Sequence, residues 1–100
     1  MSGKHFETLW EQCEKFQQEA TANISVQQIM EELTMKIGLY KAIDSKTEIP
    51  EEDRQKVKSR TLGEILLTLT ALSLKDNVNV YDVLNIALQY RSVDHYVRKT

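Results

Sequence analysis

Hydrophobic and polar positions alternate along this chain at helical intervals, in four stretches separated by three polar breaks. From about residue 5 to residue 20, apolar side chains recur every three or four positions, which predicts a first helix. Its predicted apolar stripe consists of Phe6, Leu9, Trp10, Cys13 and Phe16. A second helix is expected to start near Val26, because Ser25 can cap its first turn and Gln28 can complete a capping box.

The next two stretches are also predicted to be helical. The second helix should end between Ala42 and Asp44, and a third should begin at Pro50, because proline is tolerated in a first turn and the acids after it favour the positive end of the helix dipole. The predicted stripe of the second helix is Ile29, Met30, Leu33, Ile37 and Tyr40. The second half of the third helix is apolar almost all round, through Leu62, Ile65, Leu66, Leu67, Leu69, Ala71, Leu72 and Leu74. Such a helix is surrounded by protein on most sides, which favours a partner subunit.

A fourth helix is predicted from about Val80 to Arg91, because Asn79 and Asp82 form a weaker version of the capping signature. The tail, residues 92–100, can extend this helix, dock on a partner or fray. The chain has one proline and three glycines, too few for the turns of hairpins and barrels. We therefore predict a single all-α domain over residues 1–100, with a core at about 5–91.

Composition excludes several classes of function. The chain is 41% hydrophobic and 28% charged, and its net charge of −2 provides no general attraction to nucleic acid or to an anionic membrane. No stretch resembles a secretory signal or a membrane span. Cys13 is the single cysteine, so no internal disulfide can form, and no neighbouring residues complete a zinc site. We expect a soluble cytoplasmic protein without a nucleic-acid or membrane partner.

Two short acidic segments carry the candidate chemistry. The second predicted helix contains the segment Glu31 to Met35, and the third contains the segment Thr61 to Glu64. Acids on two facing helices can hold a divalent cation between them. Together with the proline start at Ile49-Pro50 and the apolar run from Thr61 to Leu88, the chain resembles the MazG-like nucleotide pyrophosphohydrolases from about Phe6 to Arg91.

The resemblance implies a four-helix bundle completed by homodimerisation or tetramerisation. It also implies an Mg²⁺-dependent enzyme that splits nucleoside triphosphates into monophosphate and pyrophosphate. The family pairs an EExxE motif with an ExxD motif. Here Glu31 and Glu32 match the first motif and Met35 replaces its last acid, whereas Thr61 and Glu64 replace the two acids of the second. Activity is therefore expected to be weak or specialised.

Roles follow from the resemblance residue by residue. Glu32 and Glu64 would hold the metal, and Glu31 would orient the attacking water. Aromatic residues of the first helix stack on a base in some relatives, which makes Trp10 a candidate, although a core position is the common role of an aromatic residue on such a stripe. The candidates for contact with phosphate are Lys36, Lys56, Lys58, Arg60 and Arg91.

A second function remains open on the same residues. The acids can be ordinary solvated side chains, and the chain can be a non-catalytic helical module that assembles through its apolar surface. If Glu31, Glu32 and Glu64 meet at a polar cavity, the enzyme is favoured. If Met35 and Leu62 fill that space, the module is favoured.

Overall fold

A computed structural model describes the backbone of residues 2–99 and the side chains of residues 8–92. All regular structure in this range is helical, in the order α1 (Ser2–Ala20), α2 (Val26–Asp44), α3 (Glu51–Lys75) and α4 (Val80–Lys99). The predicted all-α class and the four helices are confirmed. The last helix is longer than expected, because it continues through most of the predicted tail.

Helix starts follow the predicted local chemistry. The Ser25 hydroxyl accepts a hydrogen bond from the Gln28 backbone N–H at 3.1 Å, and the Gln28 side chain accepts one from the Ser25 N–H at 2.9 Å, which completes the capping box of α2. Pro50 precedes three acids in the first turn of α3. Asn79 Oδ1 accepts from the Tyr81 backbone N–H at 2.8 Å and so caps α4. Each cap uses backbone donors that a helix start leaves without a partner.

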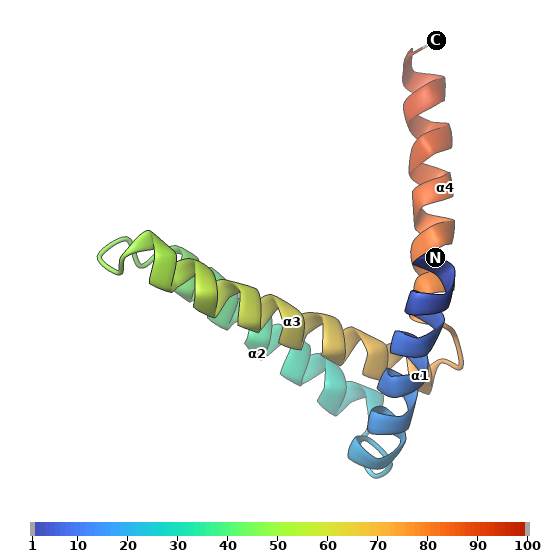
Figure 1. Cartoon of the computed structure of the whole chain (residues 1–100), viewed down its shortest axis with the longest axis horizontal. Helices are drawn as coiled ribbons and strands as arrows, with labels where there is room; N and C mark the ends of the chain where they lie inside the picture. Colours follow the sequence, from blue (N-terminus) through green and yellow to red (C-terminus); the bar gives the residue numbers. More distant parts are fainter. Residues whose placement is uncertain (1, 100) are drawn as a thin grey trace.

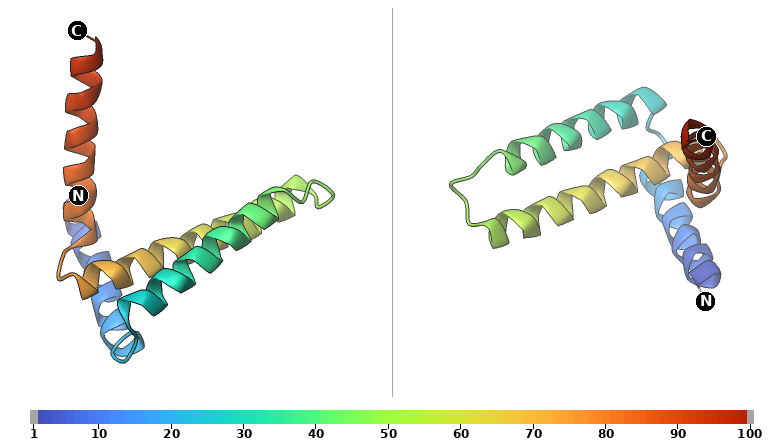
Figure 2. Two further views of the ribbon diagram at one scale, coloured as in Figure 1. Left: turned by 180° about the vertical axis from the view of Figure 1, so that it is seen from behind. Right: turned by 90° about the horizontal axis from the view of Figure 1, so that it is seen from above.

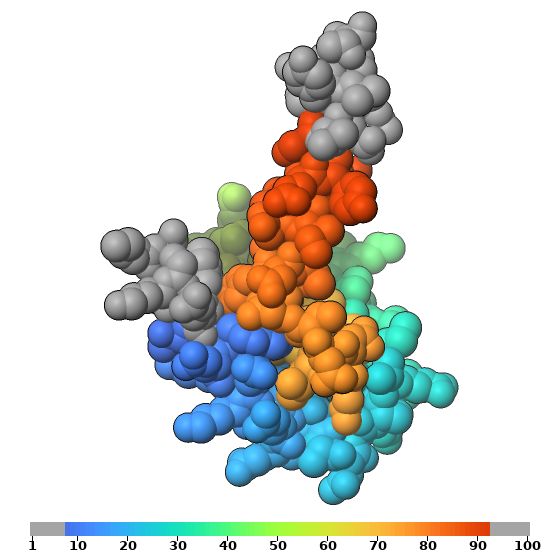
Figure 3. Space-filling view, turned by 90° about the vertical axis from the view of Figure 1, so that its right-hand side faces the viewer, coloured from blue at the N-terminus to red at the C-terminus, as the bar shows by residue number. Residues whose placement is uncertain are grey.

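Helices α2 and α3 form a long antiparallel hairpin, and α1 crosses the end of it where α2 begins and α3 finishes (Figure 1). Two further views show the same arrangement, with α4 directed away from the hairpin (Figure 2). In the space-filling view α4 rises from the body formed by the other helices (Figure 3). Within one chain the four helices therefore do not close into a bundle.

Dimensions reflect this open shape. The radius of gyration is 16.6 Å, whereas a compact domain of this length has a value of about 13 Å. The buried apolar side chains among the described residues are those of Trp10, Ile29 and Ala71. A core of that size leaves many large apolar side chains on the surface, as described below. None of the helices in the described range combines the length and apolar character of a membrane span.

A polar clamp joins α1 to α3. Gln17 is only 4% exposed, and its Nε2 donates hydrogen bonds to the Leu67 carbonyl at 2.8 Å and to Thr70 Oγ1 at 3.1 Å. Phe16, which we predicted on the buried stripe, is 54% exposed. The buried face of α1 keeps Trp10 and the half-buried Cys13 from the predicted stripe, but continues through Gln17 in place of Phe16.

The hairpin also follows the predicted pattern only in part. Of the predicted stripe of α2, Ile29 is almost completely buried and Leu33 and Tyr40 are half-buried, whereas Met30 and Ile37 are exposed. On α3, Leu62 and Leu66 are exposed in the single chain, so this helix is not enclosed on most sides. Its buried residues are Thr68, Thr70, Ala71 and Ser73. The hairpin thus retains an apolar outer surface.

Near the base of α4, Tyr81 is partly buried. Burial raises the pKa of its phenol, and the nearby Cys13 thiol on α1 raises it further. This contact lies where α1 meets α4. The Cys13 side chain is half-buried there.

Candidate functional site

Glu32 on α2 and Glu64 on α3 face each other across the hairpin. The side chain of Lys36 lies between them. Its Nζ is 3.2 Å from Glu32 Oε1 and 3.5 Å from Glu64 Oε2. The same nitrogen donates a hydrogen bond to Thr68 Oγ1 at 2.8 Å. Three side chains from two helices therefore converge on one ammonium group.

Helical spacing produces this cluster. Glu32 and Lys36 are four residues apart on α2, and Glu64 and Thr68 are four residues apart on α3, so each pair shares one helix face. The Thr68 hydroxyl donates to the Glu64 backbone carbonyl at 2.9 Å, which leaves its oxygen free to accept from Lys36. Because α2 and α3 are adjacent, the two faces meet.

The cluster lies beside a cavity of about 200 Å³ between α1, α2 and α3. The residues that line this cavity are Phe16, Gln17, Ala20, Thr21, Ile24, Glu32, Lys36, Glu64, Leu67, Thr68 and Ala71. Pockets that enclose drug-sized ligands measure about 300–1,000 Å³. This cavity in a single chain is therefore too small to enclose a nucleoside triphosphate.

Exposure differs between the members of the cluster. The Lys36 side chain is 16% exposed, whereas those of Glu32 and Glu64 are 49% and 54% exposed. The ammonium is therefore held inside, and the carboxylates form the rim of the cavity. Two carboxylates and one ammonium leave the cluster with a net charge of −1.

The residues present do not fit a resident magnesium ion. Mg²⁺ requires oxygen ligands at about 2.0–2.1 Å in octahedral geometry, and the space between the two carboxylates is already taken by Lys36 Nζ. Within the part of the chain whose side chains are described, no three His, Cys, Asp or Glu residues are grouped closely enough to hold a metal. Met35 and Thr61, the two uncharged residues at positions of family acids, add no negative charge. Met35 is exposed, and the Thr61 hydroxyl donates to the Val57 carbonyl.

Glu31 does not join the cluster. It is exposed and lies among Val26, Gln27, Met30 and Thr34 on a different face of α2. Consecutive residues of a helix point about 100° apart, so Glu31 and Glu32 cannot both face α3. The predicted water-orienting residue and the predicted metal ligands are therefore separated in the single chain.

Lys58 is engaged at the far end of the hairpin. Its Nζ is 2.6 Å from Asp44 Oδ1 and 5.4 Å from the centre of the Tyr40 ring. The hydrogen bond to Lys58 holds the pKa of the Asp44 carboxyl below its usual value, and the same bond raises the pKa of Lys58. Lys58 thus joins α3 to α2 at a distance from the acidic cluster along the hairpin.

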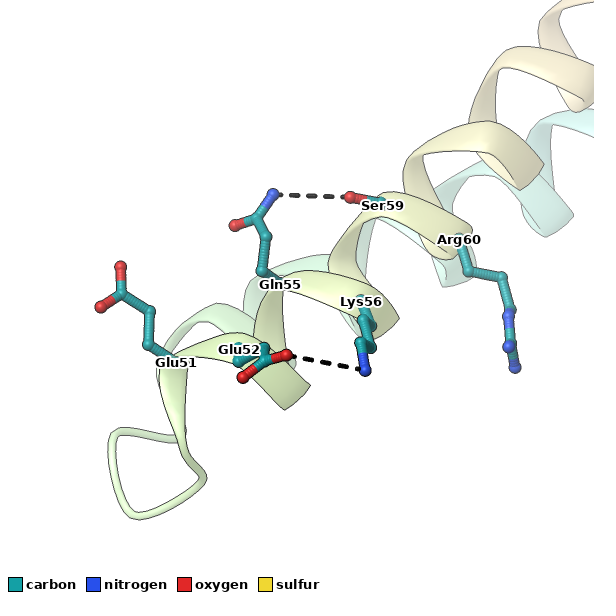
Figure 4. A pocket seen from close by; sticks show the side chains of 6 residues that line it. All are labelled: Glu51, Glu52, Gln55, Lys56, Ser59 and Arg60. Atoms are coloured by element: carbon teal, nitrogen blue, oxygen red, sulfur yellow. Dashed lines mark hydrogen bonds and ion pairs between the residues drawn. The ribbon is translucent and has the colours of Figure 1, made fainter.

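The other basic candidates also lie outside the cluster. Arg60 and Lys56 border a shallow hollow that is lined by α3 alone, together with Glu51, Glu52, Gln55 and Ser59 (Figure 4). Lys56 pairs there with Glu52 at 3.9 Å. Arg91 is exposed on α4, which points away from the hairpin (Figure 1). Since Trp10 is buried, its ring contributes to the core and is not presented at the surface.

The test posed by the sequence gives a mixed result. Glu32 and Glu64 meet at a cavity and Glu31 does not, while Met35 and Leu62 are exposed and do not line that cavity. Sequence reasoning assigned Lys36 only to phosphate contact and did not single out Gln17. The spacing of Glu32 and Lys36 could have indicated the first ion pair, but no local signal marks Gln17.

Comparison with protein-family models, with curated proteins and with solved structures gives no match for this chain.

Proposed function

We propose that this chain is a MazG-type helical domain of the nucleotide pyrophosphohydrolase class, with weak or specialised activity. In the reaction, water adds to a phosphorus of a nucleoside triphosphate and the bond to the pyrophosphate leaving group breaks. The observation that carries the proposal is the convergence of Glu32 and Glu64 from two helices on one cavity. A carboxylate at that rim can accept a proton from the attacking water.

Charge explains why the activity should be weak. The resemblance implies Mg²⁺ as a cofactor, but Lys36 Nζ lies where the ion would bind, and we assign no step to a metal. The cluster keeps a net negative charge, so it offers no electrostatic attraction to a polyphosphate. Within the cluster, only the ammonium of Lys36 offsets the negative charges of Glu32 and Glu64.

A second copy of the chain is the partner that we propose. Leu66 and the neighbouring apolar residues of α3 and α4 border an apolar hollow of about 500 Å³. The most exposed apolar side chains of α4 are Leu84, Ile86, Leu88 and Tyr90. Leu84 and Leu88 lie on one side of this helix, and Ile86 and Tyr90 lie on the opposite side. Exposed apolar surface of this kind on a small domain is typical of a protein interface. A homodimer or tetramer would cover this surface, complete the helical bundle and enlarge the site.

A non-catalytic homo-oligomeric module is the second candidate. The position of Lys36 favours it, because a lysine between two acids stabilises the hairpin and needs no substrate. In that case the apolar surface is the functional part of the molecule.

Pyrophosphate release separates the two candidates. Canonical and modified nucleoside triphosphates are incubated with the full chain and with a Glu32→Gln, Glu64→Gln double variant, in the presence of Mg²⁺ or Mn²⁺. The enzyme hypothesis expects release by the unmodified chain and its loss in the double variant. Equal background from both proteins would leave the module as the function.

Self-association is tested by Leu66→Glu and Leu84→Glu, each compared with Gln89→Glu on the exposed surface of α4. Sedimentation equilibrium should show a homo-oligomer for the unmodified chain and for the Gln89 variant, and a smaller species for the two leucine variants. A monomeric unmodified chain at high concentration would contradict the proposed assembly.

A further inference from the structure

We propose that the ammonium group of Lys36 is the resident cation of this site, in place of a divalent metal ion. The inference rests on the proposed function only in taking Glu32 and Glu64 as the site, and it does not require hydrolysis. Its basis is geometric, because Lys36 Nζ contacts Glu32, Glu64 and Thr68 at 3.2, 3.5 and 2.8 Å. Nothing in the motif itself assigns this role to a lysine.

The three contacts match the chemistry of an ammonium group. A lysine ammonium has three N–H donors and no acceptor. Here three oxygens, two of them charged, surround it on the hairpin. A metal ion between the same two carboxylates would meet a positive charge a few ångströms away, and the repulsion would weaken its binding. One set of oxygens therefore cannot serve both cations at once.

Lys36 differs from an ordinary surface ion pair. Lys56 and Glu52 form such a pair within α3, at 3.9 Å, with side chains that are 73% and 85% exposed. Pairs of that kind contribute little to stability and are easily replaced by water and salt. Lys36 is only 16% exposed, links two helices and also bonds a neutral hydroxyl. The neutral hydrogen bond keeps the ammonium in place when solution ions compete for the carboxylates.

Removal of this lysine should uncover a metal site. In Lys36→Met the side chain keeps its approximate length and loses its charge, so Glu32 and Glu64 face each other with no cation between them. Two neighbouring carboxylates repel each other and gain by sharing a divalent ion. The unmodified chain should have no preferred site for such an ion at this position, whereas the variant should bind the ion there.

Mn²⁺ binding to the full chain tests the inference, with free Mn²⁺ measured by electron paramagnetic resonance. We expect Lys36→Met to bind Mn²⁺ about tenfold more tightly than the unmodified chain. The matched control, Lys56→Met, removes a lysine of the same charge from the exposed pair and should change nothing. Adding Glu64→Gln to Lys36→Met should abolish the gain. Equal affinity in all four proteins, or no gain in Lys36→Met, would overturn the inference.

Folding of the variants is checked by circular dichroism, and Lys36→Gln serves as a second variant because its amide can still hydrogen-bond to Thr68. A measurement on the unmodified chain is independent of any variant. Mn²⁺ should cause no selective broadening of the NMR signals of residues 32, 36 and 64, and selective broadening there would overturn the inference. No nucleotide is present in either experiment, so their outcome is separate from that of the pyrophosphate assay.

Discussion

Two lysines of the α2–α3 hairpin cross to the other helix, one midway along the hairpin and one near its far end, yet the two lysines have different surroundings. Midway along the hairpin, Lys36 joins two carboxylates and a hydroxyl beside a cavity that α1 also lines. At the far end, Lys58 pairs with the single carboxylate of Asp44 and lies over Tyr40. The first cluster keeps a net negative charge, whereas the second is neutral.

This difference separates a candidate site from a structural contact. A neutral pair over an aromatic ring leaves no unbalanced charge for a ligand, and its role is to hold the hairpin together. The cluster around Lys36 combines a cavity, contacts between α2 and α3 and a net negative charge. A cavity with a few converging polar groups is the usual setting of a binding site. One kind of contact, a lysine with a carboxylate, thus forms part of the candidate site at Lys36 and a structural link between two helices at Lys58.

The largest expected effect is on packing at the α1 end. Ile29→Ala removes a side chain that is almost completely buried and should lower the free energy of unfolding by about 2–5 kcal/mol. Ile43→Ala at the far end removes a half-buried side chain and should cost less. Urea denaturation of both variants measures the difference. A larger loss from Ile43→Ala would reverse the assignment of the better packed end.

The polar clamp of α1 should have the next largest effect. Gln17→Ala removes the donor to Leu67 and Thr70 and should lower the free energy of unfolding by about 1–3 kcal/mol. Gln18→Ala, on the exposed side of the same helix, should change it by less than about 0.5 kcal/mol. Thermal unfolding of both variants tests the expectation, which fails if the two changes are equal.

A smaller effect is expected for the coupling within the acidic cluster. A double-mutant cycle of Lys36→Met with Glu64→Gln should give a coupling of about 0.5 kcal/mol, because Glu64 is half exposed. The same cycle on Lys56 and Glu52 should give no measurable coupling, since both side chains are exposed. Urea denaturation supplies the four free energies of each cycle. If the two cycles gave equal coupling energies, the Lys36–Glu64 pair would be no more than a surface ion pair.

The smallest effect should come from Asp44→Asn at the far end. The folded protein lowers the pKa of Asp44 from 3.8, so the stability that this carboxylate contributes is present above pH 3.8 and is lost as pH falls through the lowered value. It raises the pKa of Lys58 from 10.5, so that contribution is present below pH 10.5 and is lost as pH rises through the raised value.

The difference in melting temperature between the unmodified chain and Asp44→Asn should therefore be small, greatest at neutral pH, and reduced at both extremes. Thermal unfolding at several pH values measures it, with Glu48→Gln in the neighbouring loop as the control. A difference that grows toward low pH would contradict the sign derived from Asp44.

The helix starts could be predicted because their causes are local. Ser25 and Asn79 accept hydrogen bonds from backbone groups within three residues of themselves, and Pro50 stands directly before the first residue of α3. The buried faces could be predicted only in part. Trp10 and Ile29 lie on the predicted stripes and are buried, whereas Phe16 and Met30 lie on the same stripes and are exposed, because burial also depends on which helix lies opposite. Gln17 is buried in place of Phe16 because α3 offers a carbonyl and a hydroxyl at that point.

The candidate site shows the same limit. The resemblance to the MazG-like motifs implied that Glu32 and Glu64 face each other, and the hairpin brings them to one cavity. The position of Lys36 depends on the register of α3, which sets Thr68 within 2.8 Å of its nitrogen. If a second copy covers the outer surface, as we propose, the apolar positions Met30 and Leu66 reflect an interface that one chain does not reveal.

Because α4 projects from the rest of the molecule, the short connection between α3 and α4 determines the direction of this helix. This helix of 20 residues is about 30 Å long, and it follows a connection in which Asn77 adopts a left-handed backbone with φ of 57°. Asparagine is one of the few residues that tolerate this conformation. A rotation of about 10° at that residue would move the far end of a lever of this length by about 5 Å. The backbone conformation of Asn77 therefore affects where the far end of α4 lies.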